Sequence, residues 1–110
     1  MEQQQVLKAI SDETRMKILR LLLKRNYCVG ALAQNLGLTE ATISQHLKVL
    51  REAGLLTGER RSYFMHYDVE RGVLRKLAAE IEALADILRE PCSHPAKGDV
   101  QHGDCGCHQS

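Results

Sequence analysis

The sequence has no tryptophan, two prolines and very few aromatic residues, which make up 4% of its 110 residues. A core without large aromatic rings has to be filled by aliphatic side chains, and the many Leu, Ala and Ile residues favour helices packed on helices. A chain of this length can close one hydrophobic core but not two. The composition therefore predicts a single small domain that is mostly helical.

Long apolar runs are also missing. No stretch approaches the roughly 18 residues that a membrane-spanning helix needs. The first residues, MEQQQVLKAISDETR, lack the basic stretch and the apolar core of a secretory signal. We therefore expect a cytoplasmic protein with no membrane partner. Thiols stay reduced in the cytoplasm, so the four cysteines indicate metal binding or redox sensing rather than structural disulfides.

The chain has no block of like charge, and its formal net charge is +1. This balance excludes a basic arm as the DNA-binding element, but individually placed residues can still contact DNA. The sequence also shows no Gly-rich phosphate loop, no Ser-His-Asp arrangement and no carboxylate pair in a plausible pocket. We therefore expect neither an enzyme nor a protein with a small organic substrate.

The apolar residues that are present predict amphipathic helices at both ends of the domain. The first helix is short and covers 6–10, and Ser11 with Asp12 offers an N-cap for the next helix, ETRMKILRLLLKR. A last helix over 71–90, stopped by Pro91, repeats apolar residues every three or four positions, the spacing of a coiled-coil seam. These residues are Leu74, Leu77, Ile81, Leu84 and Leu88.

The stretch CVGALAQNLGLTEATISQHLKVLREAGLL predicts two short helices joined by a tight turn. The first spans about Val29 to Leu36 with Gly37 as its C-cap. The second begins after Thr39 as N-cap and ends at Gly54. The small Ala33 lets the two helices cross steeply, as in a helix-turn-helix. The inner face of the second helix consists of Ile43, Leu47 and Leu50.

After Gly54 the pattern changes to that of a half-buried strand. Tyr63, Met65 and Tyr67 alternate with their neighbours, which is the period of a strand. We expect Leu55-Leu56 to pair with this strand, and 58–62 to form the hairpin tip from which two arginines project. The fold class is therefore mostly α with a small β-hairpin. Residues 1–90 form a winged helix-turn-helix domain.

Residues 91–110 form a Cys- and His-rich tail with few apolar residues. Cys105 and Cys107 can reach one soft ion because Gly106 lets the backbone turn between them, and Cys92 can complete the site. Three thiolates suit arsenite. A fourth ligand would suit cadmium or zinc. The candidate fourth ligands are Cys28, His94, His102 and His108. Binding of the ion would then order the tail.

Three alternatives to this metal-sensing tail remain open. The tail can sequester metal without regulating anything. A redox or persulfide switch can replace the metal signal, with Cys28 and Cys92 as a better pair than the strained Cys105–Cys107 disulfide. The chain can also be a metal-binding protein with no operator activity, and a DNA shift assay separates this class from a regulator.

The motifs DETRMKILRLL and TISQHLKVLREAGLL, together with Tyr67 at the end of the wing, resemble the ArsR/SmtB family of metal- and stress-responsive bacterial repressors. The resemblance covers about residues 5–90. It implies a homodimer that is built on the first and last helices. It also implies that this dimer binds inverted-repeat operator DNA and leaves it when an effector binds.

The resemblance also implies a set of DNA-contacting residues. Those on the second helix of the helix-turn-helix fall where the family reads its operator, and their polar groups suit base edges in the major groove. They are Thr42, Ser44, Gln45 and His46. The expected phosphate contacts are Lys48, Arg60 and Arg61, with Tyr63 lining the wing. For His46 the alternative is a structural role, as a cap or packed against the neighbouring helix.

The chain departs from the family's pattern at the wing and at the effector sites. Ser62 and Tyr63 stand where the family usually has a glycine and often has a basic residue. Residues 71–90 contain no histidine, so the family's zinc site on the last helix is absent. Cys28 keeps half of the arsenic-type Cys-x-Cys, because Gly30 occupies the second position. The C-terminal cysteines are therefore the expected effector site, and Cys28 is expected to pack as a small apolar residue.

Overall fold

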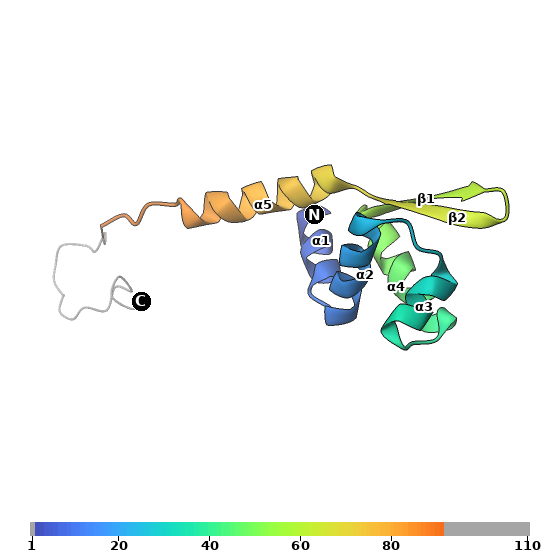
Figure 1. The fold of residues 1–110 in the computed structure, drawn as a ribbon. Coiled ribbons are helices and arrows are strands. Elements are labelled where there is room, and N and C mark those ends of the chain that lie inside the picture. Colours follow the sequence, from blue (N-terminus) through green and yellow to red (C-terminus); the bar gives the residue numbers. More distant parts are fainter. Residues whose placement is uncertain (1, 92–110) are drawn as a thin grey trace.

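The computed structural model describes residues 2–91 of the chain. This part forms five helices and a two-stranded antiparallel sheet, which confirms the predicted fold class. Figure 1 shows the helices gathered into a body, with the hairpin extending from one end and the last helix running toward the other. The elements are α1 (Glu2–Ile10), α2 (Glu13–Lys24), α3 (Val29–Leu36), α4 (Glu40–Glu52), β1 (Leu56–Arg61), β2 (Phe64–Val69) and α5 (Arg71–Ala85).

The boundaries of α2, α3 and α4 are set by short-range caps. The carboxylate of Asp12 accepts the N–H of Arg15 at the start of α2. Thr39 Oγ1 accepts the N–H of Thr42 at the start of α4, at 3.1 Å. Gly37 ends α3 in the left-handed conformation, with φ of 68°. Each contact satisfies a backbone group that a helix end leaves unpaired, and each confirms the predicted cap.

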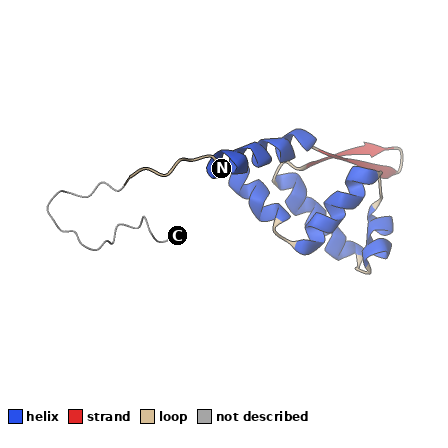
Figure 2. Cartoon of the chain, turned by 60° about the vertical axis from the view of Figure 1, so that its left-hand side comes forward, coloured by secondary structure: helices blue, strands red, loops and turns tan. Residues whose placement is uncertain are grey.

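The core is aliphatic, as the lack of large aromatic residues predicts. Its fully buried side chains come from α2, α3, α4 and the residue before β1. They are Ile18, Leu32, Ile43, Leu50 and Leu55. Tyr67 of β2 is the buried aromatic residue of this core. The helices therefore hold the hairpin by its inner end, and Figure 2 shows the strands leaving the helical body from there.

The hairpin tip lies further along the chain than predicted. Gly58 is inside β1 and pairs with Tyr67, and the two-residue loop consists of Ser62 and Tyr63. The prediction treated Gly58 as a turn residue, but this glycine serves close packing. A Cβ atom there would lie 3.1 Å from Met65 Cε and 3.2 Å from Tyr67 Cε1. The prediction of a tip over 58–62 was therefore wrong, and Tyr63 belongs to the loop rather than to the strand.

The last helix is shorter than predicted. α5 ends at Ala85, whereas the apolar spacing and Pro91 predicted a helix that continues to residue 90. Leu77 is buried against the body, but Leu84 is 67% exposed and Leu88 is 86% exposed. Most of the stability of a helix in a protein comes from packing of its apolar face. In a single chain the apolar residues near the end of this segment have little to pack against.

No helix within residues 2–91 is long and apolar enough to cross a membrane. The predicted metal ligands Cys92, Cys105 and Cys107 lie outside the described residues. The same holds for the candidate ligands His94, His102 and His108.

Candidate nucleic-acid interface

Helix α4 has one face in the core and the opposite face in solvent. Ile43, Leu47 and Leu50 are buried, as predicted from their spacing. Gln45 and Lys48 are exposed on the opposite side, and Ser44 is exposed beside them. Because side chains three and four residues apart share a helix face, Gln45 and Lys48 project together. This face offers an amide, a hydroxyl and an ammonium group to a groove of DNA.

The first turn of α4 contains a chain of hydrogen bonds between two threonines. Thr39 Oγ1 accepts the Thr42 N–H and donates its own proton to Thr42 Oγ1 at 3.0 Å. Thr42 is half-buried and Glu40 is exposed. The hydroxyl of Thr42 is thereby held at the N-terminal end of α4, the end whose residues reach base edges in helix-turn-helix proteins.

His46 differs from the other predicted base-reading residues because it faces the start of α2. It is half-buried, and its Nδ1 lies 3.4 Å from Nη1 of Arg15. The N–H of Arg15 lowers the pKa of Asp12 below its ordinary value through the cap hydrogen bond, and the charge of the Arg15 guanidinium adds to this effect. This position favours the alternative in which His46 packs against the neighbouring helix.

The arginines predicted for the wing lie at the outer end of β1. Arg61 Nη2 is 3.3 Å from Glu59 Oε1, so part of its charge is already balanced within the strand. Tyr63 is 87% exposed, and its ring centroid is 6.3 Å from that of Phe64. The loop between the strands forces Ser62 to a φ of 61°. The wing tip therefore presents two cations and two aromatic rings to solvent.

A hydrogen bond attaches the wing to the helical body, and it involves a residue that the sequence did not single out. The side-chain oxygen of Asn26 accepts the N–H of Tyr67 at 3.2 Å. The N–H of Glu70 donates to the carbonyl of Leu55 at 2.8 Å. Nothing in the sequence around Asn26 indicates a partner 41 residues away. The loop after α2 thus fixes the inner end of the wing.

Cys28 is exposed, so the prediction that it packs as an apolar residue is wrong. It is the N-cap of α3, and its Sγ accepts the N–H of Ala31 at 3.4 Å. The neighbouring Gly30 lies under the Glu40 carboxylate, because a Cβ atom there would be 3.2 Å from Glu40 Oε2. Within residues 2–91 no three His, Cys, Asp or Glu side chains lie close enough together to hold a metal ion.

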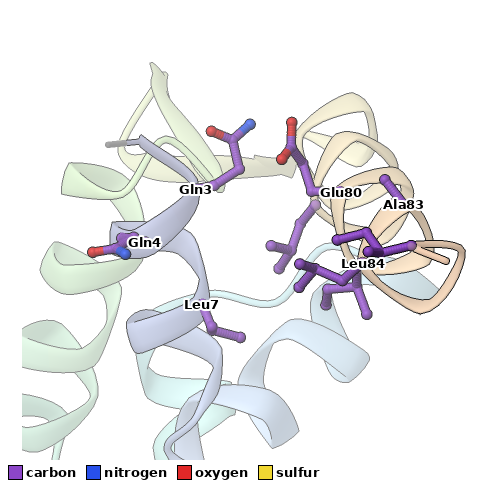
Figure 3. Close-up of a pocket in the computed structure, with 9 residues that line it drawn as sticks. Gln3, Gln4, Leu7, Glu80, Ala83 and Leu84 are labelled. Atoms are coloured by element: carbon purple, nitrogen blue, oxygen red, sulfur yellow. The ribbon is translucent and has the colours of Figure 1, made fainter. Parts of the chain in front are cut away.

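A groove with apolar walls separates α1 from the outer part of α5 (Figure 3). It has a volume of about 410 Å³. Leu7 is 49% exposed on the α1 side, and Leu84 is 67% exposed on the α5 side. Ile81 and Ile87 of the same groove are 49% and 71% exposed. Apolar side chains of α1, of α5 and of the segment after α5 thus line one groove, together with the polar Gln3, Gln4 and Glu80.

Comparison with known proteins identifies the family. Residues 12–57 match the family model described as bacterial regulatory protein, arsR family. The transcriptional repressor SdpR of Bacillus subtilis (strain 168) is 37% identical over 64% of this chain and 78% of its own length. An arsenical resistance operon repressor of the same organism is 32% identical over 93% of this chain and 88% of its own length. The chain belongs to the ArsR family.

A solved structure shows the same fold in an assembly. It is the solution NMR structure of a homodimeric winged helix-turn-helix DNA-binding domain from Mycobacterium bovis, a possible ArsR-family transcriptional regulator. It is 26% identical, with a TM-score of 0.63 over 84% of this chain and 87% of that one. This ArsR-family chain is therefore a DNA-binding transcriptional regulator and not an enzyme.

Proposed function

We propose that this ArsR-family regulator is a repressor that occupies its operator as a homodimer and leaves it when a thiophilic ion binds the C-terminal cysteines. The observation that carries the DNA-binding part is the exposed polar face of α4, whose opposite face is locked into the core by three buried residues. A helix held in this way can enter the major groove without moving relative to the domain. The protein would act in the cytoplasm, where thiols stay reduced.

The DNA contacts that we propose follow from the exposure of each side chain. Thr42, Ser44 and Gln45 would meet base edges, because hydroxyl and amide groups can both donate and accept hydrogen bonds there. The cations of α4 and the wing would contact phosphates. They are Lys48, Arg60 and Arg61. Tyr63 at the wing tip would pack against the DNA backbone.

The homodimer would form through the apolar surface of α1 and α5. Isolated soluble chains rarely leave a continuous apolar patch in water. The support here is Leu84, Ile87 and Leu88, which are 67% or more exposed in one chain. The homodimeric structure of the relative from Mycobacterium bovis also supports a dimer. A two-fold dimer would present two copies of α4 to an inverted-repeat operator.

The effector would bind where the tail follows the dimer surface. Cys92 comes four residues after the exposed Leu88, and Cys105 and Cys107 follow it in the sequence. An ion that draws these thiolates together would act on the segment that continues from α5. Similarity to an arsenical resistance operon repressor supports a soft ion such as arsenite, and a set of four ligands would suit cadmium or zinc.

A thiol redox or persulfide switch is the second candidate, and the exposure of Cys28 favours it. An exposed thiol is accessible to oxidants and to other thiols, whereas a packed one is not. In this alternative Cys28 would pair with Cys92 and no metal would be required. The DNA-binding part of the proposal is the same for both sensors.

The test is fluorescence anisotropy of a labelled DNA fragment from the region upstream of the protein's own gene. Arsenite, cadmium, zinc, peroxide and polysulfide are titrated against the wild type and a Cys105→Ser/Cys107→Ser variant. We expect one of the ions to release DNA from the wild type but not from this variant. Cys28→Ser is the second variant, because serine keeps the N-cap of α3 and removes the thiol that the redox switch requires.

The outcomes separate the candidates. Release by oxidants alone, abolished in Cys28→Ser, would establish the redox switch instead of the metal site. If every effector leaves the wild type bound, the C-terminal cysteines are not a sensor. If the wild type binds no fragment more tightly than an unrelated sequence, the operator-binding proposal itself fails.

A further inference from the structure

One side chain joins three helices at the corner between α1 and α2. The guanidinium of Arg15 donates from Nε to the carbonyl oxygen of Ala9 at 2.7 Å, in the last turn of α1. Its Nη1 lies 3.4 Å from Nδ1 of His46 on α4. Its backbone N–H donates to the carboxylate of Asp12 at 3.0 Å, which caps α2. Arg15 is half-buried, so these contacts replace much of its contact with water.

The position of this corner connects two functions of the domain. α1 contacts both α4 and α5, and α2 contacts α4. Figure 1 shows α1, α2 and α4 side by side, with the inner end of α5 above α1. Arg15 therefore lies between the helix that exposes the polar face and the helix that contributes to the apolar surface. A change at this corner can alter how the two surfaces are oriented.

The contact between Arg15 and His46 constrains the protonation of the imidazole. A guanidinium has donors and no acceptor, and it stays charged throughout the stable pH range. His46 Nδ1 must therefore carry a lone pair to accept from Arg15, and its hydrogen must be on Nε2. A doubly protonated imidazole would point an N–H at the Arg15 N–H, so the hydrogen bond would be lost.

The other groups around His46 do not restore this contact. The Asp12 carboxylate interacts electrostatically with both groups, and its negative charge would offset part of the repulsion between Arg15 and a protonated His46. It is already engaged as the cap of α2 by the N–H of Arg15. From α1 the neighbouring group is the carbonyl of Ala9. Within residues 2–91 no charged side chain of α3 or β1 forms a hydrogen bond or an ion pair with His46.

We propose that Arg15 is a positioning residue for DNA binding, which holds α4 in its DNA-reading orientation through a neutral His46. His46 then serves the placement of the helix and reads no base. The proposal rests on α4 being the DNA-reading helix and is independent of the effector. It predicts that acidification weakens operator binding through His46, whereas a histidine that touched DNA would gain affinity when protonated.

The first test compares Arg15→Ala with Arg20→Ala in the anisotropy assay with the operator fragment. Arg20 is an exposed cation of the same helix, so its variant controls for the loss of one positive charge. We expect Arg15→Ala to bind operator about three- to tenfold more weakly, the loss typical of one or two hydrogen bonds. Arg20→Ala should stay within about twofold of the wild type. The melting temperature of each variant verifies that it is folded.

The salt dependence of binding separates positioning from a phosphate contact. The logarithm of the binding constant falls with the logarithm of the salt concentration, and each lost phosphate contact makes this negative slope less steep by about 0.9. A positioning residue touches no phosphate, so the slope of Arg15→Ala should equal that of the wild type. A reduced slope would show that Arg15 contacts DNA directly and would overturn the proposal. Wild-type affinity in a folded Arg15→Ala protein would overturn it as well.

The second test uses pH and does not depend on the folding of Arg15→Ala. His46→Asn keeps an acceptor near the position of Nδ1 and cannot become charged. Affinity is measured from about pH 8 to about pH 5.5, the range in which histidine changes its charge. We expect the ratio of wild-type to variant affinity to fall on acidification. The effects of the other histidines on DNA affinity are the same in both proteins, so they cancel in this ratio.

Two other pH dependences of this affinity ratio would contradict the inference. A ratio that rises on acidification would show that protonated His46 contacts DNA, and a constant ratio would show that its protonation is irrelevant. Either result overturns the inference. If the wild type binds no operator even at about pH 8, DNA reading itself fails, and this failure belongs to the proposed function. If binding at about pH 8 is normal and the predicted differences are absent, the failure belongs to Arg15 and His46.

Discussion

Among the residues that the structure describes, Ser62 is the non-glycine residue with a positive φ, which is 61°. Replacing Ser62 with glycine removes its Cβ atom. An L residue in this region is strained by about 1–2 kcal/mol because its Cβ approaches a carbonyl oxygen. Glycine avoids this strain but loses about 0.5–1 kcal/mol more conformational entropy on folding. We therefore expect Ser62→Gly to stabilise the folded protein by about 0.5–1 kcal/mol.

Thermal unfolding followed by circular dichroism measures this change. In a domain of this size 1 kcal/mol corresponds to a shift of about 4–8 °C, so we expect the melting temperature to rise by about 2–8 °C. The loop is at the exposed wing tip, which can open without global unfolding. Slower amide hydrogen exchange in β1 and β2 would therefore accompany the shift.

Ser62→Ala is the matched control for this substitution. It also removes the hydroxyl group but keeps the Cβ, so the strain should persist and the melting temperature should not rise. A Ser62→Gly protein that melts below the wild type would refute the reasoning. An equal rise in both variants would show that the hydroxyl, and not the backbone conformation, destabilises the loop.

Three further predictions concern a cap, a charge and the dimer surface. Thr39→Ala should lower the free energy of unfolding by about 1 kcal/mol in urea titrations, whereas Thr39→Ser should keep the cap oxygen and most of the stability. The pKa of Asp12 is lowered in the folded state, so its carboxylate contributes stability that is present above the unfolded value of 3.8 and is lost as the pH falls below it. Asp12→Asn keeps a cap and removes this charge, and its stability should therefore fall less than that of the wild type between about pH 5 and pH 2. Leu84→Glu should give monomers in size-exclusion chromatography with light scattering. Arg75→Glu, at an exposed position of the same helix, should remain dimeric. Equal behaviour of the two variants would remove the support for this interface.

Most of the helical scaffold could be predicted because its signals are local. Asp12, Gly37 and Thr39 act on backbone groups within a few residues, so their roles follow from residue type and position. The core face of α4 follows from the helical period alone. The exposed polar residues of α4 could be named because the same period places them opposite the buried face, and their contact with DNA stays a proposal.

The parts that could not be predicted depend on contacts between distant segments. The register of the hairpin is set by Met65 and Tyr67 packing on Gly58, which sequence alone presents as a turn signal. Asn26 and Arg15 find partners 41 and 31 residues away, and no local pattern indicates such pairs. His46 faces α2 because of its contact with Arg15, and this contact cannot be seen in the local sequence. The sequence therefore presents His46 as another polar residue of the exposed helix face.

The two-threonine cap of α4 gives the Thr42 hydroxyl a direction. Thr39 uses its oxygen for the Thr42 N–H and its proton for Thr42 Oγ1, so that one acceptor site of Thr42 is occupied from inside the protein. The proton of Thr42 and its second lone pair are then left to point outward. In the major groove that proton can be donated to purine N7, guanine O6 or thymine O4, whereas a cytosine N4 amino group has to use the one lone pair of Thr42 that remains.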